Sequence, residues 1–299
     1  MKYDLCCLGS AIVDLTFQVD DDFTKKNEDR GIAKGAMTLI EKNDQNNMIN
    51  ELTELGGLPE KACGGSATNS VVAASLFGSK CYMSCIVAND ANGKFYLEDL
   101  SKNGVGHGTK PLNSELPSGQ CLVMISEDAE RTMCTNLGLN TEISGDNIDE
   151  EMIKNSNYIL LEGYLIASPG GHDLFKKAVS MAKIYDTKVA LSLSDAFIVS
   201  SFRNELKELI EIKCDLIFCN ETEAVEFCGT ESEDEIFNYF KKYTPSVLIT
   251  KGSDGCIGFE EDHHFSVSGI EVQAIDTNGA GDMFAGAVLH DLNNSKDLE

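Results

Sequence analysis

The sequence predicts an α/β fold in which a mostly parallel sheet is flanked by helices and carries a small β-sheet lid. After residue 140, short β-rich runs alternate with helical patterns, which is typical of βαβ units. The runs at 158–161 and 216–219 are apolar without alternation, as expected for strands covered on both faces. The segments 12–40 and 107–136 instead show short alternating runs and turn residues, which favours a separate antiparallel patch.

Each element of the second half follows from its local pattern. In chain order we expect a strand at 158–161, a helix after Pro169, a strand at 188–193, a helix near 202–213, a strand at 215–218, helices up to residue 243 and a strand at 247–250. The helix near 202–213 is predicted because its apolar residues share one face, at Phe202, Leu206, Leu209 and Ile210. A strand-like run at 271–275 precedes a final helix, whose expected apolar face comprises Met283, Phe284, Ala287 and Val288.

The 299 residues divide most economically into one large domain with an inserted lid. The large α/β domain is expected to comprise residues 1–11, 48–106 and 137–299, and the β-lid residues 12–47 and 107–136. The pair Gly64-Gly65 follows the first excursion and is placed to act as a hinge. The acidic run at 20–22 is interpreted as a solvated turn.

Acidic residues outnumber basic ones, with 49 Asp and Glu against 24 Lys and Arg and a formal net charge of −25. Such a surface repels nucleic-acid phosphates and anionic membranes, so neither is an expected partner. It would also repel an anionic substrate. Any phosphate handled here must therefore be held by helix N-termini, backbone amides or a metal ion.

Eleven cysteines are scattered along the chain without a Cys-x-x-Cys spacing, which favours free thiols in a reducing cytoplasm over a disulfide framework or a zinc site. The pair His263-His264 lies in an acidic stretch and is interpreted as a surface strand or turn. The apolar run at 5–13 is bracketed by aspartates and lacks a cleavage site, and no stretch approaches the roughly 18 apolar residues of a membrane span. We therefore expect a soluble, cytoplasmic protein.

The stretch 276–286, Asp-Thr-Asn-Gly-Ala-Gly-Asp-Met-Phe-Ala-Gly, is the most informative motif. Its glycines at 279 and 281 let backbone N–H groups approach a ligand at the positive end of a helix, which makes an anion site without a cationic side chain. It is not the dinucleotide fingerprint, because Phe284 stands where a glycine is needed. A carboxylate beside such a cradle, Asp282, would repel phosphate but would accept a proton from an attacking alcohol. The alternative is that Asp282 only stabilises the helix N-terminus.

Two further motifs have both a functional and a structural interpretation. Gly64-Gly65 followed by Asn69 suits close backbone contact with a polar ligand and an amide bonded to a diol. The alternative is a tight turn and a helix cap by Ser66 or Thr68. Asn220 and Glu223 form a capping-box pattern after a strand. The same pair would organise Mg²⁺ through water if both side chains face phosphates, and both accounts can hold together.

Together these motifs resemble the signatures of the ribokinase-like (PfkB) family of sugar and nucleoside kinases. The stretch from Asp276 to Asp282 is similar to its C-terminal signature, and Gly64 to Asn69 to its N-terminal signature. Further similar strings occur in the family's order, at 9–14, 220–223 and 250–255. The resemblance implies an ATP-dependent kinase with a Rossmann-like, ribokinase-like α/β domain and a β-lid that closes over the substrate.

The resemblance also implies a role for each matching residue. Asp282 would be the catalytic base that takes the proton of a substrate CH₂OH, and the amides of Gly279, Ala280 and Gly281 would form the anion hole. The remaining implied positions are Asp14, Gly64, Gly65 and Asn69 for the substrate, Thr250, Gly252 and Asn278 for the nucleotide, Asn220 and Glu223 for Mg²⁺ through water, and the backbone of Asp276 for a monovalent cation such as K⁺.

Within the family, several strings look like adenosine kinases and their bacterial relatives, at 34–39, 131–138, 163–169 and 193–197. Arg131 matches a lid arginine that would neutralise phosphate charge on closure, or is a solvated strand residue. Tyr164 matches a position that is aromatic in nucleoside kinases and would support base stacking, or is core.

The leading hypothesis is therefore an ATP-dependent phosphotransferase acting on the primary hydroxyl of a nucleoside, with adenosine as the expected substrate. The alternative is a sugar kinase for ribose, fructose or a related carbohydrate. A third hypothesis is an inactive nucleotide- or sugar-binding protein without a complete ATP site, because family members continue well past the helix that carries Asp282 whereas this chain ends at Glu299. The expected partners are a small-molecule nucleoside or sugar and, at most, a second copy in a homodimer.

Overall fold

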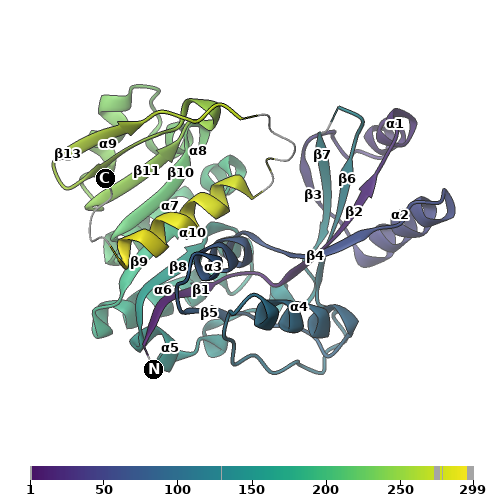
Figure 1. Ribbon diagram of the computed structural model, residues 1–299, viewed down its shortest axis with the longest axis horizontal. Coiled ribbons are helices and arrows are strands. Elements are labelled where there is room, and N and C mark those ends of the chain that lie inside the picture. The colour runs from purple at the N-terminus through teal and green to yellow at the C-terminus, as the bar shows by residue number, and fades with distance from the viewer. Residues whose placement is uncertain (1, 129, 273–276, 278, 295–299) are drawn as a thin grey trace.

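The computed structural model describes residues 2–128, 130–272, 277 and 279–294, which form two sheets with helices packed around them (Figure 1). The larger sheet has the strand order β13-β12-β11-β10-β9-β8-β1-β5 in the described residues. Its strands are β1 (Tyr3–Leu8), β5 (Cys81–Ser84), β8 (Ser156–Glu162), β9 (Lys188–Ser192), β10 (Leu216–Asn220), β11 (Ser246–Thr250), β12 (Cys256–Glu260) and β13 (His263–Val267). The strands from β5 to β11 are parallel to their neighbours, and β12 and β13 are antiparallel.

Helices cover both faces of the large sheet (Figure 1). They are α3 (Ser66–Leu76), α4 (Ala91–Lys102), α5 (Glu150–Lys154), α6 (Gly171–Tyr185), α7 (Ala196–Ile212), α8 (Glu221–Cys228), α9 (Glu233–Phe240) and α10 (Ala280–Leu292). Short 3₁₀ turns are η1 (Gly138–Glu142), η2 (Gly145–Asn147), η3 (Gly163–Ala167) and η4 (Gly252–Asp254). Along β8, Ile159 and Leu161 enter one apolar core while Tyr158 and Leu160 enter the other. Burial on both faces explains the unalternating apolar runs and confirms the predicted α/β class.

The small sheet has the order β3-β7-β6-β2-β4. Its strands are β2 (Ile12–Gln18), β3 (Met37–Leu39), β4 (Glu60–Gly64), β6 (Gly119–Ile125) and β7 (Arg131–Asn136), and the helices beside it are α1 (Asp21–Asp29) and α2 (Lys42–Glu54). One face packs on these helices through a core that includes Phe17, Phe23, Met48 and Leu122. Residues of the opposite face line a cavity together with residues of the large domain.

The small sheet differs from the expected antiparallel lid in three respects. The pairs β2–β6 and β3–β7 are parallel, so the sheet is mixed. Strand β4 at 60–64 also belongs to the small sheet, because the chain returns from α2 and pairs with β2. The first lid segment therefore extends past residue 47, where we expected it to end. Residues 106–112 instead bridge to the edge of the large sheet at Tyr82 and Ala88. The acidic run at 20–22 is also no turn, since Asp20 caps α1 by accepting from the Phe23 N–H at 2.8 Å.

Two helices differ in detail from the sequence prediction. Helix α7 begins at Ala196, where Asp195 caps it. Of its four predicted apolar residues, Leu206, Leu209 and Ile210 are buried, whereas Phe202 is half-buried and has a non-helical backbone conformation that kinks the helix. On α10 the predicted apolar residue Met283 is 44% exposed, whereas Ala285, Gly286 and Leu289 are buried. A Cβ at Gly286 would lie 2.3 Å from the Ser70 carbonyl oxygen, so small residues let α10 approach α3 closely.

The expected strand at 271–275 falls mostly outside the described residues. Within the described part of the chain, none of the helices combines the length and the apolar character needed to span a membrane.

Candidate active site

A cavity of about 840 Å³ lies between the small sheet and the carboxyl ends of the parallel strands. Four of its lining residues are the last residues of consecutive strands β8 to β11, namely Glu162, Ser192, Asn220 and Thr250. Ligands of open α/β sheets bind at this edge, because polar side chains and helix N-termini meet there. The cavity is also large enough for a substrate of drug-like size.

Asp282 lies in the first turn of α10 and faces this cavity. Its carboxylate accepts a hydrogen bond from Ser66 Oγ at 2.6 Å and another from Asn69 Nδ2 at 2.9 Å. Burial raises the pKa of the Asp282 carboxyl, and these two hydrogen bonds oppose the rise. The structure thus brings Asp282 and Asn69 together from opposite ends of the chain, and Ser66, predicted as a helix cap, is a hydrogen-bond partner of Asp282 instead.

The predicted anion hole forms the N-terminus of α10, beside the cavity. Gly279 has φ +71°, and a Cβ there would approach Asn69 Nδ2 to 3.1 Å, so this position suits glycine. A Cβ at Gly281 would meet nothing within 4 Å, which leaves room for a ligand next to the helix end. The Ala280 N–H is directed elsewhere, to the Thr277 carbonyl oxygen at 3.2 Å. The predicted positions Asp276 and Asn278 lie outside the described residues.

Asp14 contributes a second carboxylate to the cavity from β2. Burial raises its pKa to about 6, against the opposing effect of the positive charge on Arg131. The turn that follows β4 approaches this carboxylate so closely that a Cβ at Gly64 would lie 2.4 Å from its oxygens. Gly65, which lines the cavity, has φ +97°, a conformation that favours glycine. The glycine pair therefore shapes the wall around Asp14.

Apolar residues of the small sheet form the wall beyond Asp14. Strand register places Asp14, Cys121, Thr135 and Leu39 in one row across β2, β6, β7 and β3. All four line the cavity, together with Ile12, Met37, Met133 and Leu137. These apolar contributions, which the motif analysis did not assign to the site, follow from the period-2 alternation that sends every second residue to one face.

Arg131 and Tyr164 occupy different surroundings. Arg131 begins β7, does not line the cavity, and acts on Asp14 through its charge. Tyr164 lies in η3, where it lines the cavity and packs against one apolar core. Burial and neighbouring carboxylates raise the pKa of its phenol.

Asn220 and Glu223 also line the cavity, at the start of α8. They form the predicted capping box, in which the Asn220 side chain accepts from the Glu223 N–H at 2.9 Å and the Glu223 carboxylate accepts from the Asn220 N–H at 3.1 Å. Glu223 is buried, and burial raises its pKa to about 7. An oxygen-donor pair with a buried carboxylate fits a hard cation such as Mg²⁺. The described residues contain no cluster of three or more His, Cys, Asp or Glu arranged to hold a metal ion directly.

The two remaining nucleotide positions differ in their access to the cavity. Thr250 lines it as the last residue of β11. Gly252 follows in η4 with φ +57° and is not among the lining residues. Between them, Lys251 forms ion pairs with Glu221 at 3.2 Å and Glu233 at 2.6 Å, which fixes the loop against α8 and α9.

Glu162 is a buried cavity residue that belongs to none of the sequence motifs. It ends β8, is 2% exposed, and accepts a hydrogen bond from the Ala67 N–H at 2.8 Å. Burial raises its pKa to about 7, and the nearby charge of Asp282 adds to the rise. The signal in the sequence was a glutamate directly after the apolar run at 158–161, where a buried strand meets the ligand edge of the sheet.

These buried carboxyls predict how stability depends on pH. The pKa values of about 6 for Asp14 and about 7 for Glu162 and Glu223 exceed the unfolded values, so the folded state binds more protons between roughly pH 4 and 7. Stability should therefore rise as pH falls through this window, by about 1.4 kcal/mol per pKa unit of each group. We expect the Tm of the ligand-free protein to be higher at pH 6 than at pH 8.

Two matched variants distinguish the effect of these buried carboxyls on stability from the general repulsion between negative charges. Glu162→Gln should raise Tm at pH 8 and flatten its pH dependence, whereas Glu54→Gln removes an equal charge from the exposed end of α2 and should do neither. A Tm that falls between pH 8 and pH 6, or equal slopes in the two variants, would contradict the prediction.

Comparisons with known proteins show which family this chain is similar to. Residues 31–299 match the model of the pfkB family of carbohydrate kinases. The chain is 30% identical over 247 residues to a ribokinase of Haemophilus influenzae, an alignment covering 80% of this chain and 76% of that enzyme. It is 22% identical over 263 residues to a guanosine-inosine kinase of Escherichia coli, covering 85% of this chain and 60% of that enzyme. The crystal structure of adenosine kinase from Sinorhizobium meliloti superimposes with a TM-score of 0.90 and 30% identity, covering 100% of this chain and 90% of that one.

Proposed function

The chain belongs to the pfkB family of carbohydrate kinases, as an ATP-dependent sugar or nucleoside kinase, and we propose that its acceptor is the primary CH₂OH of a nucleoside, adenosine in the first instance. The observation that carries this choice is the apolar wall of the cavity. Ile12, Met37, Leu39 and Met133 extend it beyond the carboxylate of Asp14.

This wall favours a nucleoside over a free sugar because the two differ in the free energy of leaving water. A pentose or hexose carries a hydroxyl on nearly every carbon, and burying such hydroxyls without partners against apolar side chains is unfavourable. A purine presents a flat apolar face, which gains free energy when it leaves water for the same surface. In our proposal the ribose lies toward Asp14 and Asn69, and the base lies against the small sheet and Tyr164.

The proposed chemistry assigns proton transfer to Asp282. Its carboxylate takes the proton of the substrate CH₂OH as that oxygen attacks the γ-phosphorus of ATP, and ADP leaves. Ser66 and Asn69 hold the carboxylate in place through their hydrogen bonds. The positive end of α10, at Gly279 and Gly281, stabilises the negative charge of the transferring phosphoryl group.

The nucleotide side of the proposal rests on α8 and β11. Asn220 and Glu223 would hold Mg²⁺ through water, and the metal would neutralise phosphate charge. Thr250, Gly252 and Asn278 would contact the nucleotide, and the backbone of Asp276 would take part in a monovalent-cation site for K⁺. We further propose a cytoplasmic location, because the described cysteines are free thiols, as is typical of a reducing compartment.

A substrate panel tests the acceptor. Adenosine, inosine, ribose and fructose are each offered with MgATP, and ADP release is measured with and without K⁺. We expect the highest kcat/KM with adenosine, and turnover with free sugars alone would replace the nucleoside assignment by the ribokinase-like alternative. If no acceptor is turned over, calorimetric titration with adenosine and ATP decides whether the chain only binds these ligands.

A further inference from the structure

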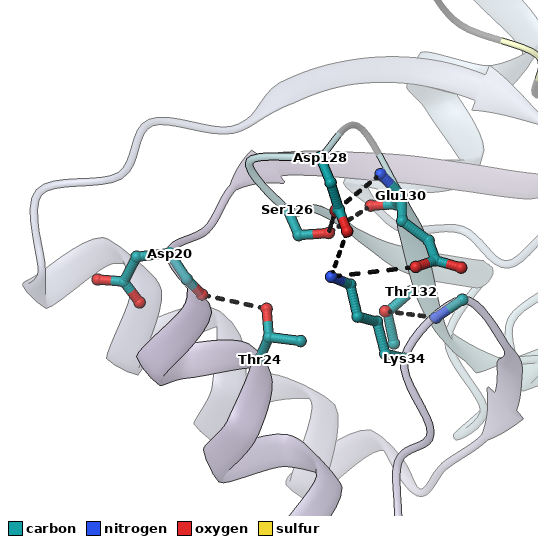
Figure 2. Close-up of polar contacts among 8 residues, drawn as sticks. Asp20, Thr24, Lys34, Ser126, Asp128, Glu130 and Thr132 are labelled. Atoms are coloured by element: carbon teal, nitrogen blue, oxygen red, sulfur yellow. Dashed lines mark hydrogen bonds and ion pairs between the residues drawn. The ribbon is translucent and has the colours of Figure 1, made fainter.

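An ionic cluster of Lys34, Asp128 and Glu130 connects two segments of the small domain that are far apart in the sequence (Figure 2). Lys34 Nζ lies 2.6 Å from Asp128 Oδ2 and 4.0 Å from Glu130 Oε2. The other oxygen of Asp128 accepts from Ser126 Oγ at 2.6 Å, within the turn between β6 and β7. The lysine of one segment is thereby fixed to a turn that is itself organised around the same aspartate.

The two residues that follow Lys34 are attached to β7 as well. The Gly35 N–H donates to Thr132 Oγ1 at 3.1 Å, and the Ala36 carbonyl oxygen accepts from the Met133 N–H at 2.9 Å. Gly35 has φ +75°, a backbone conformation that favours glycine, and a Cβ there would require the Glu130 carboxylate to move. Three successive residues thus fix the entry into β3.

Strand β3 depends on such anchoring because it is weak by itself. It has three residues, pairs only with β7 among the described strands, and does so in parallel. Typical strands have about 5–6 residues, and parallel pairing is slightly less stable per residue. Yet β3 carries Met37 and Leu39, which are 41% and 58% exposed and line the cavity.

From these contacts we propose that Lys34 is a positioning residue for the acceptor, whose ion pair with Asp128 holds β3 and its two apolar side chains over the cavity. The inference rests on the proposed function only in naming a nucleoside as that acceptor. Lys34 does not line the cavity and acts through Met37 and Leu39. It should therefore influence acceptor binding more than the chemical step.

The test compares Lys34→Met, which keeps the stem but removes the ammonium group, with Lys34→Arg, which restores the charge. Because partly exposed ion pairs are weak, we expect Lys34→Met to raise the adenosine KM about 3–5-fold, with the kcat and the ATP KM within twofold of wild type. Lys34→Arg should restore the adenosine KM. Asp128→Asn should reproduce the effect of Lys34→Met, and the double variant should show no further increase.

Hydrogen exchange of the ligand-free protein gives a second measurement that does not depend on the acceptor. Lys34→Met should accelerate exchange of the amides at 37–40, whereas Lys94→Met, which removes a lysine paired with Glu98 at 3.8 Å on α4, should not. Unchanged exchange, an unchanged KM, or a loss confined to kcat would each overturn the proposal. If the substrate panel identifies a sugar instead, the proposed function fails. The same KM comparison, made with that sugar, then still tests whether Lys34 positions the acceptor.

Discussion

Replacing Asp282 by asparagine is expected to lower kcat by about 10²–10⁴ while leaving the binding of adenosine and ATP nearly unchanged, because general base catalysis contributes a factor of this size. Asparagine keeps the shape of the side chain and an oxygen that accepts from Ser66 Oγ, but it has no basic lone pair for the substrate proton. Steady-state kinetics with adenosine, together with calorimetric binding of both substrates, measures the two effects separately.

The competing account of Asp282 is that it only stabilises the N-terminus of α10. Asp173 provides the matched control, because it is an exposed aspartate in the first turn of α6 and does not line the cavity. Asp173→Asn removes the same favourable helix-dipole interaction, worth about 0.3–1 kcal/mol at an exposed site, and should leave kcat unchanged. Full turnover in Asp282→Asn, or equal losses in the two variants, would remove Asp282 from the proposed mechanism.

The large sheet was predictable because its strands are buried on both sides. In a chain that alternates strands and helices, a short apolar run such as 158–161 indicates a strand covered on both faces. The small sheet was harder, since β4 is polar and mostly exposed and becomes a strand only by pairing with β2. Helix α1 was missed for a similar reason, because Phe23 and Asn27 are its only buried residues and leave no apolar periodicity.

The site was predictable where backbone geometry requires glycine. It was less predictable where tertiary packing determines which side chains meet. The glycines near Asp282 and Asp14 stand out in the sequence, and the structure gives Gly65 and Gly279 the positive φ angles that favour this residue. No local pattern shows that Ser66 donates to Asp282 across 216 positions of the chain. Glu162 was overlooked because its burial follows from the meeting of β8 with the N-terminal end of α3.

Asp14 should be the second most sensitive position, with an effect on acceptor binding rather than on chemistry. A hydrogen bond from a sugar hydroxyl to a charged carboxylate is worth about 1.5–3 kcal/mol, so Asp14→Ala should raise the adenosine KM about 10–150-fold. The ATP KM should stay within twofold, which serves as the internal control. The variant should also lose the ability to discriminate adenosine from either its 2′-deoxy or its 3′-deoxy analogue, and that loss identifies the hydroxyl that Asp14 contacts.

Gly64→Ala tests the same carboxylate without removing it. The added Cβ would lie 2.4 Å from the Asp14 oxygens, so the carboxylate must move and the adenosine KM should rise in the same direction as in Asp14→Ala. Because both changes act through one group, the double variant Gly64→Ala/Asp14→Ala should be no worse than Asp14→Ala alone. Additive losses in the double variant would mean that the glycine turn binds the acceptor by itself, and a wild-type KM in Asp14→Ala would exclude Asp14 from the acceptor site.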